Sequence, residues 1–137
     1  MQNILSDIHQ YNQRLTISQV CAFFSRKGLR LTKSMVQNYV RDGLLCPPVD
    51  KRYYTPKHLA NLAIIDFLKP VYEMGEIKAV IEALRDDEGI PVEIYGAYVE
   101  KVNELTAKWQ ACVASLESAN DPLAIMAHVA DLKNNVG

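Results

Sequence analysis

The sequence contains few residues of the kinds that bind metals or form disulfide frameworks. Its three cysteines, Cys21, Cys46 and Cys112, lie far apart and form no C-x-x-C pair, which argues against disulfides and against a zinc site. The three histidines, His9, His58 and His128, fall in separate segments without a paired nucleophile. No Gly-rich phosphate loop is present. We therefore expect no enzyme, no metal and no cofactor.

Long apolar runs are also missing. No run approaches the ~20 residues that span a bilayer, and the start Met1-Gln2-Asn3-Ile4 lacks the basic and apolar regions of a signal peptide. We therefore expect a cytoplasmic protein with no membrane partner. With 137 residues, of which 49% are hydrophobic and 23% charged, the chain can bury a core without metals or disulfides.

The net charge of −1 hides two halves of opposite sign. Residues 1–60 contain nine Lys and Arg against three Asp, a charge of +6, whereas residues 61–137 contain six bases and thirteen acids, a charge of −7. This asymmetry indicates a part that binds polyanions joined to an acidic part. Chance clustering of solvated surface charges would give the same division.

Two amphipathic helices are predicted in the basic half. Thr16 and Gln19 form a capping box, and apolar residues then repeat with helical spacing as far as Gly28, which suits a helix end. The second helix has Thr32 as its N-cap and ends before Gly43. Two helices joined by a short basic connection favour a helix-turn-helix. Any helical hairpin with one wet face is the alternative.

The second of these helices carries a polar stripe beside its apolar one. The spacing i, i+3, i+4, i+7 is met by Ser34, Gln37, Asn38 and Arg41, with Lys33 beside the first turn. The major groove of DNA admits one helix, and amide side chains suit adenine, whereas Arg and Lys reach guanine or phosphates. We therefore predict that these five residues contact DNA.

The segment after the second helix is not helical, because two prolines interrupt it. Residues 49–54 predict a short β-wing that turns at Asp50-Lys51 and has a basic tip. The side chains of Lys51, Arg52 and Tyr53 suit the sugar-phosphate backbone. For Tyr53, core packing with the hydroxyl at the rim is an equally good interpretation.

Two further helices are predicted before residue 90. Thr55-Pro56 starts the first one as N-cap and first helical residue, and its apolar residues leave little polar surface before Pro70 ends it. Apolar residues at helical spacing over 77–84 form the second. The acidic stretch 85–89 is then a solvated linker.

Beyond Pro91 the apolar residues follow a heptad pattern. The residues spaced alternately by three and four are Tyr95, Tyr98, Val102, Leu105, Trp109, Cys112 and Leu116. A run of three heptads predicts a coiled-coil-like dimerisation helix, although a helix of a single-chain bundle gives the same pattern. Asn120-Asp121-Pro122 ends this helix, and a short C-terminal helix is predicted to follow.

The order of these motifs resembles that of the MerR-type winged helix-turn-helix regulators. The resemblance covers residues 16–84 and rests on Thr16-Ile17, Tyr39, Gly43-Leu44-Leu45, Pro47-Pro48, Arg52-Tyr53-Tyr54-Thr55, Leu59, Leu62 and Glu76-Ile77. The chain departs from the family in a longer connection over 23–33 and in a shorter wing. Ser34, Gln37 and Asn38 stand where the family has two arginines and a tyrosine. The resemblance therefore implies a divergent bacterial branch.

The resulting fold class is mainly α. We predict an N-terminal extension helix over 1–14, a MerR-like winged helix-turn-helix domain over 15–88, and a dimerisation helix with a short C-terminal helix over 89–137. The resemblance implies antiparallel pairing of two dimerisation helices, whereas the heptad itself leaves the orientation open.

The expected function is that of a homodimeric, sequence-specific regulator of transcription that binds double-stranded DNA. A dimer supplies two half-sites, and the chain leaves no room for a large effector domain. RNA polymerase and a small ligand are further candidate partners. The alternative is a winged-helix module for protein–protein interaction that has lost DNA binding, because a fold does not imply a function.

Overall fold

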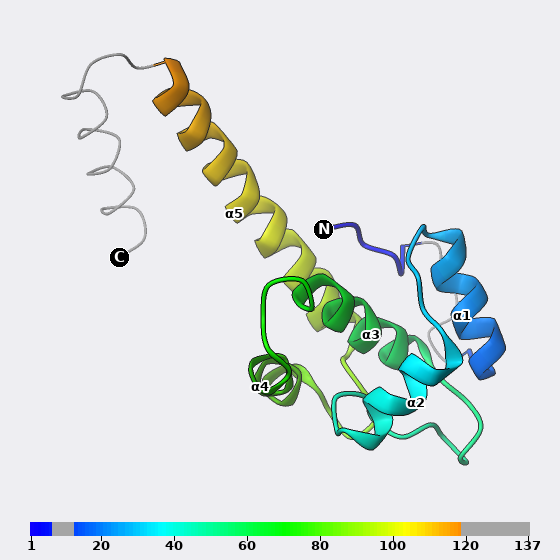
Figure 1. The fold of residues 1–137 in the computed structure, drawn as a ribbon. Helices are drawn as coiled ribbons and strands as arrows, with labels where there is room; N and C mark the ends of the chain where they lie inside the picture. The colour runs from blue at the N-terminus through cyan, green and yellow to red at the C-terminus, as the bar shows by residue number, and fades with distance from the viewer. Residues whose placement is uncertain (7–12, 119–137) are drawn as a thin grey trace. The chain divides into compact units, whose positions relative to one another are not determined.

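The computed structural model describes residues 1–6 and 13–118 of the chain (Figure 1). Its helices in this part are α1 (Ile17–Arg26), α2 (Lys33–Arg41), α3 (Pro56–Leu68), α4 (Met74–Leu84) and α5 (Val92–Ser118). The chain divides into two compact units, Met1–Val99 and Glu100–Gly137. In the described ranges, no helix is both long and apolar enough to span a membrane. The mainly helical class agrees with the sequence prediction.

The helix ends follow the local chemistry of the sequence. The hydroxyl of Thr16 accepts a hydrogen bond from the Gln19 N–H at 3.3 Å, and the Gln19 side chain accepts one from the Thr16 N–H at 2.8 Å. The predicted capping box at the start of α1 is therefore confirmed. At α2, the hydroxyl of Thr32 accepts from the Met35 N–H at 3.2 Å. Gly43, with φ +78°, follows the end of α2, as predicted.

Helix α3 forms the centre of the first unit. Ten of its thirteen residues are buried, as expected for a helix that is apolar nearly all round. Helix α3 packs against α4, and α1 packs against α2. In the view of Figure 1, α3 runs through the middle of this unit, with α4 on one side and α1 on the other.

The first residues of the chain are fixed to the beginning of α5. Ile4 and Leu5 belong to the core, with exposed fractions of 3% and 2%. The hydroxyl of Tyr95 donates a hydrogen bond to the Gln2 carbonyl oxygen at 3.1 Å and accepts one from the Ile4 N–H at 3.4 Å. The first turn of α5 is therefore part of the core of unit Met1–Val99.

No β-strand is present in the residues that the structure describes, so the predicted short β-wing is wrong. The backbone forms only two isolated antiparallel bridges there, Leu15 with Tyr54 and Val49 with Tyr53. Neither bridge extends into a ladder. On one side of the Leu15–Tyr54 bridge, the next hydrogen-bonded pair would include Pro56, which has no N–H to donate. On the other side it would join Ile17, which already begins α1, with Arg52, whose N–H is donated to the Val49 carbonyl.

The Val49–Tyr53 bridge stops for a related reason. Its next hydrogen-bonded pair would join residues 47 and 55. Pro47 has no N–H, and the N–H of Thr55 is already donated to Nδ1 of His58 at 3.0 Å. The prolines and the N-cap of α3 therefore limit the predicted wing to a single bridge and a turn.

Two predictions concern residues that the structure leaves out. Of the predicted N-terminal helix over 1–14, residues 7–12 lie outside the described residues, and the described flanks 1–6 and 13–14 are not helical. The predicted C-terminal helix lies entirely outside the described residues.

Candidate nucleic-acid interface

Helices α1 and α2 pack together as the predicted helical pair. Helix α1 buries Val20, Phe23 and Phe24, while α2 buries Val36 and Tyr39. Six residues, 27–32, connect the two helices, which is longer than the three or four residues of a typical helix-turn-helix turn. The arrangement is a helical pair with an extended connection, in which α2 keeps one face for the core and one for solvent.

The outward face of α2 carries the five residues of this helix that the sequence predicts to contact DNA. We call this set the α2 stripe; its members, Lys33, Ser34, Gln37, Asn38 and Arg41, are all exposed. On the opposite side, Val36 is fully buried and Tyr39 is 6% exposed. The guanidinium of Arg41 contacts the Asp42 carboxylate at 3.3 Å. The two amide side chains near the middle of the helix, Gln37 and Asn38, are exposed to solvent.

The dimensions of α2 suit a groove of DNA. An α-helix with its side chains is about 10–12 Å in diameter, and the major groove is about 12 Å wide. The nine residues of α2 form a segment about 13 Å long at ~1.5 Å per residue. Because Val36 and Tyr39 hold one side of the helix in the core, the stripe is presented on a fixed surface. Amides and cations on such a surface form the hydrogen bonds that base edges and phosphates accept.

The segment between Val49 and Tyr53 forms a tight turn, which we call the tip. Asp50 and Lys51 have φ angles of +53° and +60°, and the Val49 carbonyl accepts from the N–H groups of Arg52 and Tyr53 at 3.1 and 2.9 Å. The predicted turn at Asp50-Lys51 is therefore confirmed. Consecutive positive φ angles are typical of a type I′ turn. Placing a non-glycine residue in the left-handed backbone conformation costs roughly 1–2 kcal/mol of conformational free energy, and the cost is lower for Asp than for Lys.

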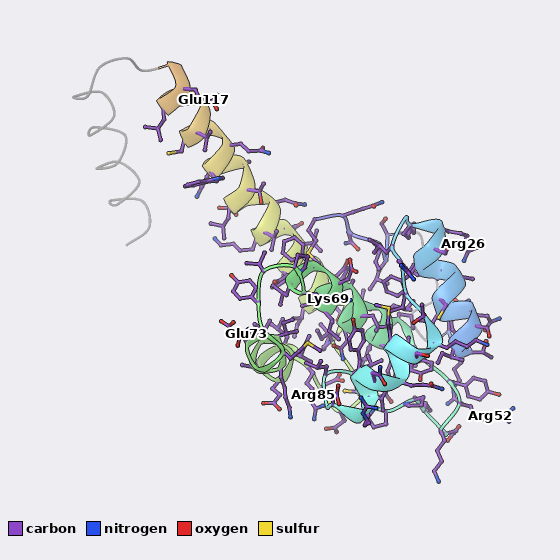
Figure 2. All side chains as sticks on the ribbon, viewed as in Figure 1. Arg26, Arg52, Lys69, Glu73, Arg85 and Glu117 are labelled. Carbon is purple, nitrogen blue, oxygen red and sulfur yellow. The ribbon has the colours of Figure 1, made fainter. Side chains whose placement is uncertain are left out.

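Cations surround the ring of Tyr53 at this tip. The guanidinium carbon of Arg52 lies 5.7 Å from the ring centre and that of Arg14 lies 5.9 Å from it. Arg14 also forms an ion pair with Asp50, with Nη1 and Oδ2 3.1 Å apart. Lys51 and Arg52 are exposed, and Tyr53 is partly buried. Figure 2 labels Arg52, whose side chain points away from the ribbon of the tip.

Arg14 is one of the nine basic residues of the first half of the chain, but no sequence motif assigns it to the site. The pair joins residues that are 36 positions apart, and no local motif connects them. The antiparallel bridge of Leu15 with Tyr54 brings the two segments together. Pairing between distant single residues leaves no periodic pattern that could be detected in the sequence.

The side chain of Cys21 on α1 is partly buried. Burial raises the pKa of the Cys21 thiol, and the positive charge of Lys33 acts in the opposite direction. Burial likewise raises the pKa of Tyr54, with a further contribution from Cys21. With a raised pKa, the Cys21 thiol is protonated and neutral near pH 7.

His58 supports this region from inside the core. Its Nδ1 accepts the Thr55 N–H, so Nε2 carries the proton and donates to the Pro47 carbonyl at 3.0 Å. Burial lowers the pKa of His58, while hydrogen bonding to Pro47 and the charge of Glu88 act in the opposite direction. The neutral imidazole thus ties the proline segment to the first turn of α3.

The thiols and acidic groups of the described residues form no metal centre. No group of three or more His, Cys, Asp or Glu residues lies close enough there to hold a metal ion. Cys46 is buried and accepts a hydrogen bond from Nη1 of Arg85 at 3.5 Å. Asp86 pairs instead with Lys57 at 2.6 Å, which secures the α4–α5 turn to α3.

The residues predicted for dimerisation have different environments along α5. Tyr95 is completely buried in unit Met1–Val99, so its side chain is covered within its own chain. Tyr98 is partly buried. Within the second unit, Leu105 and Trp109 are exposed by 53% and 64%. The remaining members, Val102, Cys112 and Leu116, are partly buried.

Comparison with known proteins overturns the resemblance to MerR-type regulators. Residues 5–100 match the model of a family described as a domain of unknown function (DUF1836), which is a different family from the MerR-type regulators. No curated protein and no solved structure matches the chain. Gly-Leu-Leu after a helix and a Thr-Pro helix start reflect local chemistry that unrelated folds share. Because the match covers most of its length, the chain belongs to the DUF1836 family.

Proposed function

We propose that this chain is a homodimeric protein that binds double-stranded DNA sequence-specifically and regulates transcription. The observation that carries the proposal is the α2 stripe: a polar and basic helix face whose five residues are all exposed, on a helix anchored by Val36 and Tyr39. A rigid helix face is what direct readout in a major groove requires.

The basic tip supports the same proposal. Among the described residues, Lys33, Lys51 and Arg52 form no ion pair, whereas Arg41 pairs with Asp42. Cations outside internal pairs are available to phosphates. In this proposal, the tip binds the sugar-phosphate backbone and fixes the register in which the α2 stripe reads bases.

Binding of random and selected DNA duplexes at several salt concentrations tests the proposal. If Lys33, Arg41, Lys51 and Arg52 all reach phosphates, the logarithm of the binding constant should fall against the logarithm of salt concentration with a slope of about −4 per protomer, or about −7 for a dimer. Fluorescence anisotropy of a labelled duplex measures it. A folded protein that shows no salt-dependent binding would contradict the proposal.

Dimerisation through α5 is the second part of the proposal. Leu105 and Trp109 are large apolar side chains on the surface of the second unit, and they share the heptad spacing with Val102, Cys112 and Leu116. We propose that a second copy of the chain covers this face. One helix-turn-helix makes a weak site, whereas a dimer binds two half-sites.

Analytical ultracentrifugation of Trp109→Ala tests the dimer. Truncating a central aromatic residue of an interface costs about 2 kcal/mol or more, which weakens dimerisation roughly thirtyfold. Gln110→Ala is the matched control, because Gln110 is exposed and lies outside the heptad stripe. A wild-type protein that remains monomeric at micromolar concentration would rule out this part of the proposal.

A protein-interaction module is the second candidate function. The observation that favours it is a segment of unit Met1–Val99 with four exposed apolar side chains: Phe67, Val71, Tyr72 and Met74. Exposed apolar groups in such a concentration mark contact surfaces for proteins. The DNA titration separates the two candidates, because an interaction module would show no salt-dependent affinity for any duplex.

A further inference from the structure

We propose that Arg14 is an additional phosphate-binding residue, and that Asp50 occupies its guanidinium until DNA displaces it. The inference rests on the proposed DNA-binding function and names the contact that the tip makes. In the free protein, Arg14 and Asp50 form a direct ion pair of 3.1 Å. A DNA phosphate would take over the place of the Asp50 carboxylate, because both present oxygens to the same guanidinium.

The geometry holds Arg14 beside the other cations of the tip. Its guanidinium carbon is 5.9 Å from the centre of the Tyr53 ring, and that of Arg52 is 5.7 Å from the same ring. A cation within about 6 Å of an aromatic ring centre is attracted to it. Two guanidinium groups thus lie beside the Tyr53 ring on the protein surface, where they can bind the negative charge of a phosphodiester.

The ion pair is weak enough to be exchanged. The side chains of Arg14 and Asp50 are 54% and 69% exposed, and solvent-exposed ion pairs contribute little. A phosphate group also accepts hydrogen bonds from a guanidinium, and the DNA backbone has a higher density of negative charge around it. Opening the pair therefore requires little, and the exchange leaves Arg14 on the DNA side of the tip.

The conformation of the tip explains why the competing carboxylate lies at this position. Asp50 and Lys51 are the two non-glycine residues of the described chain with positive φ, so the backbone is forced into a turn that few side chains tolerate. Asp is among the residues that accept this conformation best. The turn therefore places the Asp50 carboxylate opposite Arg14 while directing the adjacent cations outward.

The experiment is a double-mutant cycle on DNA affinity with Arg14→Gln, Asp50→Asn and the double variant. Asparagine accepts the left-handed conformation of residue 50, so Asp50→Asn removes the charge and keeps the turn. Arg14→Lys keeps the charge without the planar fork. Lys69→Gln is the control for loss of one cation. Lys69 is labelled in Figure 2 at the C-terminal end of α3, about 20 Å along the helix from Thr55.

We expect Arg14→Gln to weaken binding to random duplex about fivefold near 0.1 M salt and to flatten the salt slope by about 0.9 per protomer. Arg14→Lys should retain the wild-type slope. Asp50→Asn should tighten binding about threefold, and this gain should disappear in the Arg14→Gln background because Asp50 acts through Arg14. Lys69→Gln should leave affinity unchanged within twofold. Circular dichroism of each variant verifies folding.

Two results would overturn the inference while leaving the proposed function intact. In one, Arg14→Gln binds with wild-type affinity and slope. In the other, Asp50→Asn produces the same gain with and without Arg14, which would make Asp50 only a negative charge near DNA. If the wild-type protein binds no duplex at any salt concentration, the proposed function itself fails.

Discussion

Helices α2 and α3 differ most in how their surfaces are used. In α2, two of the nine residues are buried, whereas in α3 ten of the thirteen are buried. Helix α3 even buries a histidine and an asparagine with no exposed surface. Helix α3 thus contributes mainly to the core of the first unit, whereas α2 has most of its surface exposed to solvent. We therefore expect that substitutions in α3 change stability and that substitutions on α2 change DNA recognition.

The largest expected effect is the loss of a core side chain from α3. Leu59 is fully buried, and Leu59→Ala should lower the free energy of unfolding by about 2–5 kcal/mol, because it removes apolar contacts and leaves a cavity. Gln37→Ala on α2 is the control and should change it by less than about 0.5 kcal/mol. Urea denaturation measures both. Equal losses in the two variants would refute the division of roles.

Replacing Asn61 should raise the free energy of unfolding, by a smaller amount than Leu59→Ala lowers it. Both polar atoms of this side chain are buried without a hydrogen-bond partner among the described residues, and an unsatisfied buried polar group costs about 1–3 kcal/mol. Asn61→Leu keeps the branched shape and removes the polar atoms, so unfolding should require about 1–3 kcal/mol more. Asn61→Ala should gain less, since it leaves a cavity. If both variants unfold more easily than the wild type by over 1 kcal/mol, the interpretation is wrong.

Titration of His58 should make the stability of α3 depend on pH. Burial lowers its pKa in the folded protein below the reference value of 6.5, so the unfolded chain takes up the proton first as the pH falls. Stability is therefore complete above pH 6.5 and declines below it, by at most about 1.4 kcal/mol per pH unit. Urea titrations between pH 5 and 7.5 measure this decline.

His58→Gln provides the matched control for that titration. Glutamine three residues after a threonine completes a capping box, as Gln19 does with Thr16 in α1. The variant should fold and should lose the part of the pH dependence that belongs to His58. A variant with the same decline as the wild type would show that another group is responsible.

The smallest effect on folding, and the sharpest test of α2, is expected at Asn38. Its side chain is exposed, so Asn38→Ala should change the free energy of unfolding by less than about 0.5 kcal/mol. On the preferred DNA site, the same variant should lose about 1–3 kcal/mol of binding free energy, with random duplex unaffected. Competition binding with the two duplexes measures the difference. Equal losses of binding free energy on the two duplexes would show that Asn38 contacts the sugar-phosphate backbone of DNA and not the bases.

Much of this contrast could be predicted from local patterns. The capping box of α1, the Thr55-Pro56 start of α3 and the turn at Asp50-Lys51 depend on neighbouring residues, and all three agree with the structure. The exposed stripe of α2 follows from helical periodicity.

What local patterns could not supply were pairings across the chain. The spacing of Tyr95 predicts an apolar helix face, but the same spacing serves packing within one chain and between two chains. The hydrogen bonds from Tyr95 to Gln2 and Ile4 decide in favour of its own chain. Arg14 and Asp50 meet for the same reason, through backbone pairing of distant segments.

The prediction of a wing was wrong because a pattern of strand-forming residues does not show whether the backbone N–H groups that a β-ladder needs are available. Val49, Tyr53 and Tyr54 are suitable strand residues, but Pro47 and Pro56 each stand at a position where one of the bridges would need a further donor. This part of the error was readable in the sequence. The family assignment was not, since the motifs that carry the MerR resemblance describe local turns and helix starts.

The hydrogen bonds of the Tyr95 hydroxyl have a consequence for the folding of the chain during its synthesis on the ribosome. Its partner Ile4 precedes it by 91 residues, and synthesis at ~5–20 residues per second separates the two by about 5 to 18 s. Throughout that interval Ile4 and Leu5 lack one wall of the core that finally covers them. The emerging chain therefore presents an apolar start to chaperones and proteases before the first turn of α5 has been made.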